Sequence, residues 1–142
     1  MSYATQQDMV SRFGNREMVA LTDRDNTGVI DASVLSGGLT AADNEINVYL
    51  AGRYDLPLAS TPTIVRDFAC DIARYRLCSS EVTETKEIRD RYKDAVAFFT
   101  KVSRGEISLG LNALQQPIVA TAGGVKSISS PGVFTDEALD GY

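Results

Sequence analysis

A short stretch near the start of the chain, LTDRDNTGVIDASVL, carries residues whose types and spacing match a calcium-binding EF-hand loop. With Asp23 at position 1, the residues at positions 1, 3, 5, 6 and 9 are Asp23, Asp25, Thr27, Gly28 and Asp31. Side-chain oxygens are the ligands that Ca²⁺ prefers, and glycine at position 6 permits the sharp turn of such a loop. The spacing therefore raises the hypothesis of a calcium site.

The ligand that would close this site is missing. Position 12, where an EF-hand carries a glutamate that supplies two oxygens, is Val34. A helical pattern also begins at Asp31, inside the loop. A simpler interpretation is a turn, because Asp23 favours turns, Gly28 permits a positive φ and Asp31 can cap the next helix. We therefore predict no metal ligand here, and a calcium-dependent interaction module is kept only as an alternative.

The rest of the sequence offers little catalytic chemistry. It contains no histidine, which removes the commonest general base and the usual helical zinc motifs. It also lacks a glycine-rich phosphate loop and a nucleophile elbow. Cys70 and Cys78, on one helix, would lie about 12 Å apart along its axis, which is too far for a disulfide. We predict no catalytic residue, no cofactor and no enzyme activity.

The stretch IVRDFACDIARYRL, residues 64–77, concentrates charged side chains. We expect most of them to form solvated ion pairs on a helix surface, with a role in an interface as the alternative. A helical DNA-binding regulator is a further alternative, since helical connections near Arg66–Arg76 can mimic a helix-turn-helix. The net charge of −5 and the absence of a basic stripe argue against it.

Helical periodicity dominates the first 105 residues, so the predicted fold class is mainly α, a compact bundle of four to five helices. The expected helix starts are Thr5, Asn15, Asp31, Thr61 before Pro62, and Thr83 or Thr85. The helix after Pro62 has the widest apolar face, which predicts that it is central. Gly37 and Gly38 interrupt the long third helix at a cost of about 1 kcal/mol each, so we expect close helix packing or a bend there.

The composition changes after Gly105. A short strand, hairpin or extended arm is expected around Glu106–Leu111. Residues 117–142 are rich in Gly, Ser, Ala and Thr and have no helical period. We therefore divide the chain into a helical domain, residues 1–116, and an extended C-terminal arm, residues 117–142. Apolar side chains on such a thread can anchor it to another protein. The candidate partner-binding residues are Val133, Phe134, Leu139 and Tyr142.

No window of 18 apolar residues occurs, and the N-terminal residues lack a basic patch followed by an apolar run. We therefore expect no membrane span, no secretory signal and synthesis in the cytoplasm.

Four stretches, in this order and spacing, resemble the Mu-like phage and prophage neck proteins, which join heads to tails. They are YATQQDMVSRFG, LTDRDNTGVIDASVL, INVYLAGRYDLPL and CDIARYRL, and the ending VFTDEALDGY resembles the C-terminal motif of the family. The family often has a more acidic or Gly-Asp version of the calcium-like loop than Asn26-Thr27, which weakens any calcium role for this copy.

The resemblance implies a helical adaptor with arms that clasp neighbouring copies. Its expected place is the neck of the virion, in a homo-oligomeric ring that matches the twelvefold symmetry of the portal protein. The implied partners are the portal, neighbouring copies and a tail-side neck or tail terminator protein. Genomic DNA would pass the acidic lumen without specific binding, because counterion release gives affinity only to basic surfaces.

Overall fold

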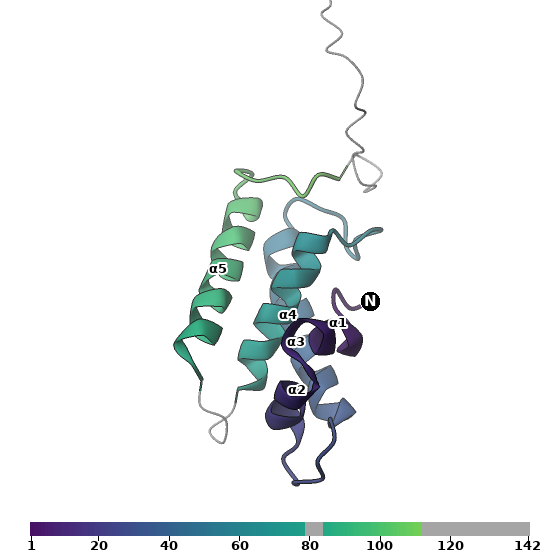
Figure 1. The fold of residues 1–142 in the computed structure, drawn as a ribbon. Coiled ribbons are helices and arrows are strands. Elements are labelled where there is room, and N and C mark those ends of the chain that lie inside the picture. Colours follow the sequence, from purple (N-terminus) through teal and green to yellow (C-terminus); the bar gives the residue numbers. More distant parts are fainter. Residues whose placement is uncertain (79–83, 112–142) are drawn as a thin grey trace, which may run out of the picture.

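The computed structural model describes residues 1–78 and 84–111. This part of the chain forms five helices and no strand, which confirms the mainly α fold class (Figure 1). The helices are α1 (Gln6–Phe13), α2 (Asn15–Thr22), α3 (Ala32–Leu50), α4 (Thr63–Leu77) and α5 (Lys86–Ser103). The predicted C-terminal arm and the proposed boundary between residues 116 and 117 lie outside the described residues.

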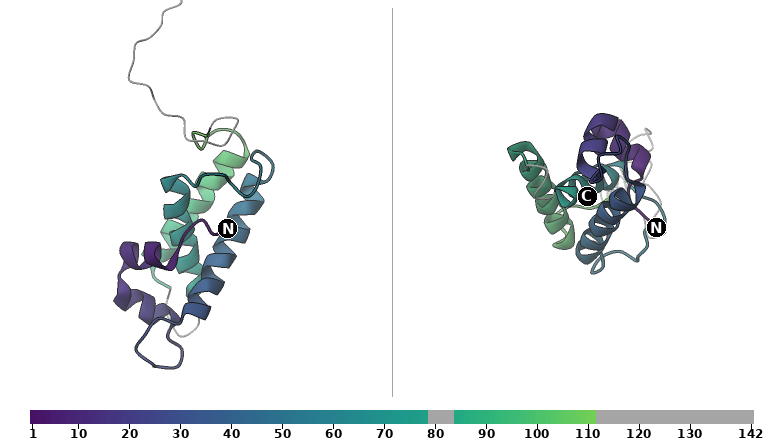
Figure 2. Two further views of the ribbon diagram at one scale, coloured as in Figure 1. Left: turned by 90° about the vertical axis from the view of Figure 1, so that its right-hand side faces the viewer. Right: turned by 90° about the horizontal axis from the view of Figure 1, so that it is seen from below.

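The three long helices run side by side, and the two short helices pack across α3 and α4 (Figures 1 and 2). Helix α4 contacts each of the other four helices and buries eight of its 15 residues. Its central position is the one predicted from its broad apolar face. The short helices each insert a methionine into the core, Met9 from α1 and Met18 from α2, and both side chains are fully buried.

Local capping signals explain where most helices begin. Thr5 and Asp8 form a capping box, in which the Asp8 amide donates to Thr5 Oγ1 and the Thr5 amide donates to an Asp8 carboxylate oxygen. Asp31 accepts from the Ser33 and Val34 amides at the start of α3, and Thr85 accepts from the Ile88 amide at the start of α5. These three caps are confirmed.

Two predicted caps are off by one residue. Gly14, at φ +89°, alone joins α1 to α2, so Asn15 is the first residue of α2 instead of its cap. Only glycine adopts this φ at no steric cost. Likewise Pro62 is the cap of α4, and Thr63 is its first residue.

The two glycines inside α3 have different environments. A Cβ atom added to Gly38 would lie 2.6 Å from Leu77 Cγ, so this glycine permits the close approach of α3 to α4. A Cβ added to Gly37 would meet nothing within 4 Å. Close packing therefore explains Gly38, and it does not explain Gly37.

The segment that follows α5 crosses the end of the bundle (Figure 1). Gly105, at φ +81°, ends the helix. Leu109 is then buried, and its amide donates to Tyr54 Oη at 3.0 Å. Residues 105–111 thus form a turn and an extended segment, which is one of the alternatives expected there; in the described residues, strand pairing is limited to an isolated bridge at Leu111.

Candidate functional site

The calcium-like loop is closed by its own hydrogen bonds. Asp23 Oδ1 accepts from the Thr27 amide at 2.8 Å and from its hydroxyl at 3.0 Å, and Asp23 Oδ2 accepts from the Gly28 amide at 2.7 Å. The bonds from the Thr27 and Gly28 amides lower the pKa of Asp23. The carboxylate expected at position 1 of a calcium site therefore serves as the centre of a turn.

The other residues of the loop also have structural roles. Asn26 and Gly28 have positive φ angles of 56° and 78°. The Asp31 amide donates to Thr22 Oγ1, while its carboxylate caps α3. Val34, at position 12, packs against the hydrophobic core. No group of three or more His, Cys, Asp or Glu side chains in residues 1–78 and 84–111 is arranged to hold a metal ion.

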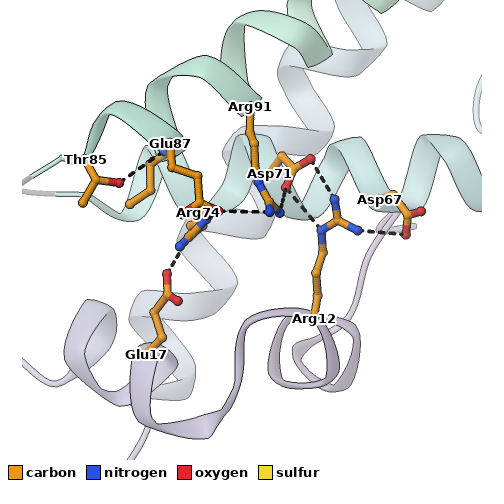
Figure 3. A network of polar contacts seen from close by, with 9 residues as sticks. Arg12, Glu17, Asp67, Asp71, Arg74, Thr85, Glu87 and Arg91 are labelled. Carbon is orange, nitrogen blue, oxygen red and sulfur yellow. Dashed lines mark hydrogen bonds and ion pairs between the residues drawn. The ribbon is translucent and has the colours of Figure 1, made fainter.

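Arg12 joins helix α1 to α4 through a paired hydrogen bond (Figure 3). Its Nε lies 3.2 Å from Asp71 Oδ1 and its Nη2 lies 3.0 Å from Asp71 Oδ2. Asp67 lies 3.7 Å from Arg12 Nη1, and Arg91 of α5 lies 3.9 Å from Asp71. Burial raises the pKa of Asp71, and the hydrogen bonds from Arg12 oppose that rise. The same pairing raises the pKa of Arg12.

Arg74 joins α4 to α2 and α5. Its Nε donates to Glu17, and its Nη1 lies 3.7 Å from a carboxylate oxygen of Glu87 (Figure 3). The guanidinium also lies over the ring of Phe13, 4.5 Å from the centroid. Asp71 and Arg74 are 4% and 8% exposed. Asp71 and Arg74 are therefore buried between helices beneath partners that are partly exposed, and the prediction of solvated surface pairs is wrong for both residues.

A second polar cluster joins α3, α4 and α5. Glu45 accepts from Arg76 at 2.6 Å and from the Tyr92 hydroxyl at 2.7 Å. The Tyr92 ring stacks on Tyr75, with centroids 4.0 Å apart. Burial and the neighbouring carboxylate raise the pKa of Tyr92 to about 12. Arg74 and Arg76 each pair with a carboxylate from another helix, so neither is an unpaired charge of the kind that a DNA-binding helix presents.

Helix α3 differs from the other four helices in its outer surface. It is the only described helix with no exposed charged residue. It has two acids. Asp43 accepts a hydrogen bond from the Tyr3 backbone amide, and Glu45 accepts from Arg76 and from the Tyr92 hydroxyl. Its exposed residues are Ala32, Ser33, Ser36, Gly37, Thr40, Asn44 and Val48. Val48 is 78% exposed, although solvent disfavours such an exposed valine.

This uncharged outer face of α3 is the surface that the sequence reasoning missed. The signal is visible in the stretch ASVLSGGLTAADNEINVYL, which contains two acids and no lysine or arginine. An exposed helix normally carries charges on its outer face. Only the structure shows that Asp43 accepts from the Tyr3 backbone amide and that Glu45 accepts from the Arg76 and Tyr92 side chains.

The predicted partner-binding residues Val133, Phe134, Leu139 and Tyr142 lie outside the described residues. Cys70 and Cys78 are free thiols, buried and partly buried, and burial raises the pKa of both. No helix in the described part of the chain is long and apolar enough to cross a membrane.

The sequence matches known phage proteins over most of its length. A family model described as "Bacteriophage Mu, Gp36" matches residues 3–127. The Mu-like prophage FluMu protein gp36 of Haemophilus influenzae is 32% identical over 110 residues, which cover 78% of this chain and 77% of that protein. Gene product J of Escherichia phage Mu is 31% identical over 114 residues, which cover 80% of this chain and 79% of that protein. The chain therefore belongs to the bacteriophage Mu Gp36 family of Mu-like phage proteins.

Proposed function

We propose that this protein is a structural virion protein, a subunit of the head-to-tail connector ring in the neck of a Mu-like phage. The observation that carries the proposal is the uncharged outer face of α3 on a member of a phage protein family. Because copies of net charge −5 repel one another, contacts between them are most favourable where no charge has to be desolvated.

The ion pairs of the bundle support a structural role over a catalytic one. Arg12, Asp71, Arg74 and Glu45 each bind a side chain from another helix, so these groups tie helices together. A body stiffened in this way transmits force between two larger assemblies without changing shape. We propose that the protein needs no cofactor and is not an enzyme.

The proposed partners are the portal protein, neighbouring copies in a ring of twelve, and a tail-side neck or tail terminator protein. Val133, Phe134, Leu139 and Tyr142 would anchor the C-terminal arm to one of these partners. Ordering such a thread costs roughly 1–2 kcal/mol per backbone residue, so a single arm binds weakly. Many arms in one ring raise the effective concentration and make the joint firm.

Deletion of the gene in its phage or prophage, followed by electron microscopy of the induced particles, tests this proposal. We expect DNA-filled heads and free tails that stay separate, with joined particles restored when the intact gene is supplied from a plasmid. Complete, infectious particles from the deletion would contradict the connector role.

A further inference from the structure

A shallow groove lies between the first half of α3 and the end of α4. Its volume is about 340 Å³, close to the lower limit of ligand pockets and enough for one or two apolar side chains. The lining residues are Arg24, Ser33, Val34, Gly37, Gly38, Ala41, Arg76 and Leu77. The six lining residues other than the arginines are small or apolar, and the two arginines supply the only charges of the lining.

Gly37 has no role within the described bundle that would justify its cost. A glycine inside a helix is less stable than alanine by about 1 kcal/mol. At Gly38 this cost is offset, because the missing side chain leaves room for the buried Leu77. A Cβ on Gly37 would instead point into open space. Since Gly37 lines the groove, its missing side chain keeps the α3 backbone open to a group that approaches from outside.

The two arginines that line the groove are accessible to solvent. Arg24 is exposed, and the Arg76 side chain is 44% exposed even while it binds Glu45. No aspartate or glutamate is among the lining residues. An occupant that complements this groove therefore has an apolar side chain for the floor and carboxylates for the two arginines.

The C-terminal sequence of the same chain has this chemistry. Residues 133–142, VFTDEALDGY, contain four large apolar side chains, three acids and no lysine or arginine. The segment that follows α5 crosses the end of the bundle where α3 finishes (Figure 1), whereas the groove lies where α3 begins. The 22 residues from Leu111 to Val133 span at most roughly 75 Å, well beyond the length of about 28 Å for α3. Length therefore does not prevent the segment from reaching the groove of its own or another copy.

We propose that the groove between α3 and α4 binds residues 133–142 of this chain. An apolar side chain of the segment lies on the surface left open by Gly37, and its carboxylates face Arg24 and Arg76. The inference rests on the proposed role of the arm and names the surface that receives it. Because the contact is small and partly electrostatic, it is weak for one pair and weakens further as salt rises.

Disulfide trapping in the purified full-length protein tests the proposal. One variant combines Ser33→Cys, in the groove, with Thr135→Cys, in the segment. The matched control combines Ser103→Cys with Thr135→Cys. Ser103 is exposed near the end of α5, close to the segment that leads to Leu111, so an arm that diffuses without docking would meet it more often. The native thiols are partly or wholly buried with raised pKa values, which slows their reaction.

We expect the Ser33 pair to form a disulfide on the order of tenfold faster than the Ser103 pair, because docking raises the effective concentration. Mass spectrometry then shows whether the bond lies within one chain or joins two. Equal rates, or a faster control, would overturn the proposal.

Two further substitutions test the chemistry of the groove against matched controls. Gly37→Gln should slow trapping at Ser33 by filling the groove, whereas Ser36→Gln, on the exposed residue beside it, should not. Arg24→Glu should slow trapping more than Arg16→Glu on α2, and Glu137→Lys should restore the rate in the Arg24→Glu protein. If Gly37→Gln left the rate of disulfide formation unchanged, the groove would be excluded as the binding surface of the segment. Since trapping needs no phage particle, it can succeed or fail independently of the connector role.

Discussion

The Arg12 guanidinium binds both carboxylate oxygens of Asp71, a residue 59 positions further along the chain. This contact places a charged pair between a short N-terminal helix and the most central helix of the bundle. The Asp71 side chain is 4% exposed, while that of Arg12 is 30% exposed. Arg12 therefore covers the carboxylate and also neutralises it, and this polar contact adds to the buried Met9 in holding α1 against the bundle.

Arg12→Met should destabilise the protein by about 3 kcal/mol, because it leaves a buried carboxylate without its main partner. Denaturation by urea at pH 7 measures the change in the free energy of unfolding. Arg16→Met, at an exposed position on α2, is the control and should change it by less than about 0.5 kcal/mol. Similar effects of both substitutions would show that the Arg12–Asp71 pair is not important for stability.

The loss caused by Arg12→Met should be smaller at pH 4 than at pH 7. Burial already raises the pKa of Asp71, and removal of Arg12 raises it further. A carboxyl whose pKa in the folded state exceeds the unfolded value of about 3.9 favours folding at low pH, and this contribution is lost as the pH rises through the folded pKa. Urea denaturation of both proteins at the two pH values checks this; a constant difference would mean that Asp71 does not titrate with folding.

Gly37→Ala and Gly38→Ala should have opposite effects on stability. The Gly37 variant gains helix propensity and should be more stable by roughly 1 kcal/mol, since its new Cβ meets no atom within 4 Å. The Gly38 variant should be less stable by about 1–3 kcal/mol, since its Cβ overlaps the buried Leu77 side chain. Thermal unfolding of the two variants side by side measures both effects. A stable Gly38→Ala protein would show that α3 and α4 can separate at little cost.

Asp23→Asn should make the protein less stable at neutral pH, with a difference that fades under acid conditions. The hydrogen bonds in its loop lower the pKa of Asp23. Its contribution is therefore present above the unfolded pKa of about 3.9 and is lost as the pH falls through the folded value. Melting temperatures of both proteins from pH 7 to pH 3 test this. If the two curves stayed parallel, the charge of Asp23 would not matter to the loop.

Calcium should not change the melting temperature. A ligand that binds only the folded state stabilises it by mass action, so roughly 5 mM Ca²⁺ would raise the melting temperature even for the weakest class of calcium modules. With Val34 at position 12 and Asp23 bonded within its own turn, we expect identical melting curves in calcium and in chelator. A calcium-dependent rise would revive the metal-module alternative.

Local features of the fold were predictable from the sequence, whereas long-range features were not. Thr5, Asp31 and Thr85 cap their helices through amides two or three residues away, so the signal lies within one turn of the chain. The wide apolar face of residues 63–77 predicted that this helix is central. The burial of Asp71 was not predictable, because it depends on Arg12 from another helix.

The groove between α3 and α4 also could not be predicted from the sequence. It exists because α3 crosses α4 where Gly38 admits Leu77, and only that crossing brings Arg24 and Arg76 to the same opening. The sequence did identify Gly37 and Gly38 as an anomaly in a helix. Only the contacts of Leu77 distinguish the glycine needed for packing from the one that faces outward.

The hydrogen bond from the Leu109 amide to Tyr54 has a consequence for assembly. Together with the burial of Leu109, it holds the last described residues at the end of the bundle where α3 finishes, whereas the groove lies where α3 begins. Each subunit therefore has a direction. In a ring whose members stood with the bundle axis along the ring axis, one rim would carry every Leu109 end and the other rim every groove, so the two faces of the ring would differ chemically.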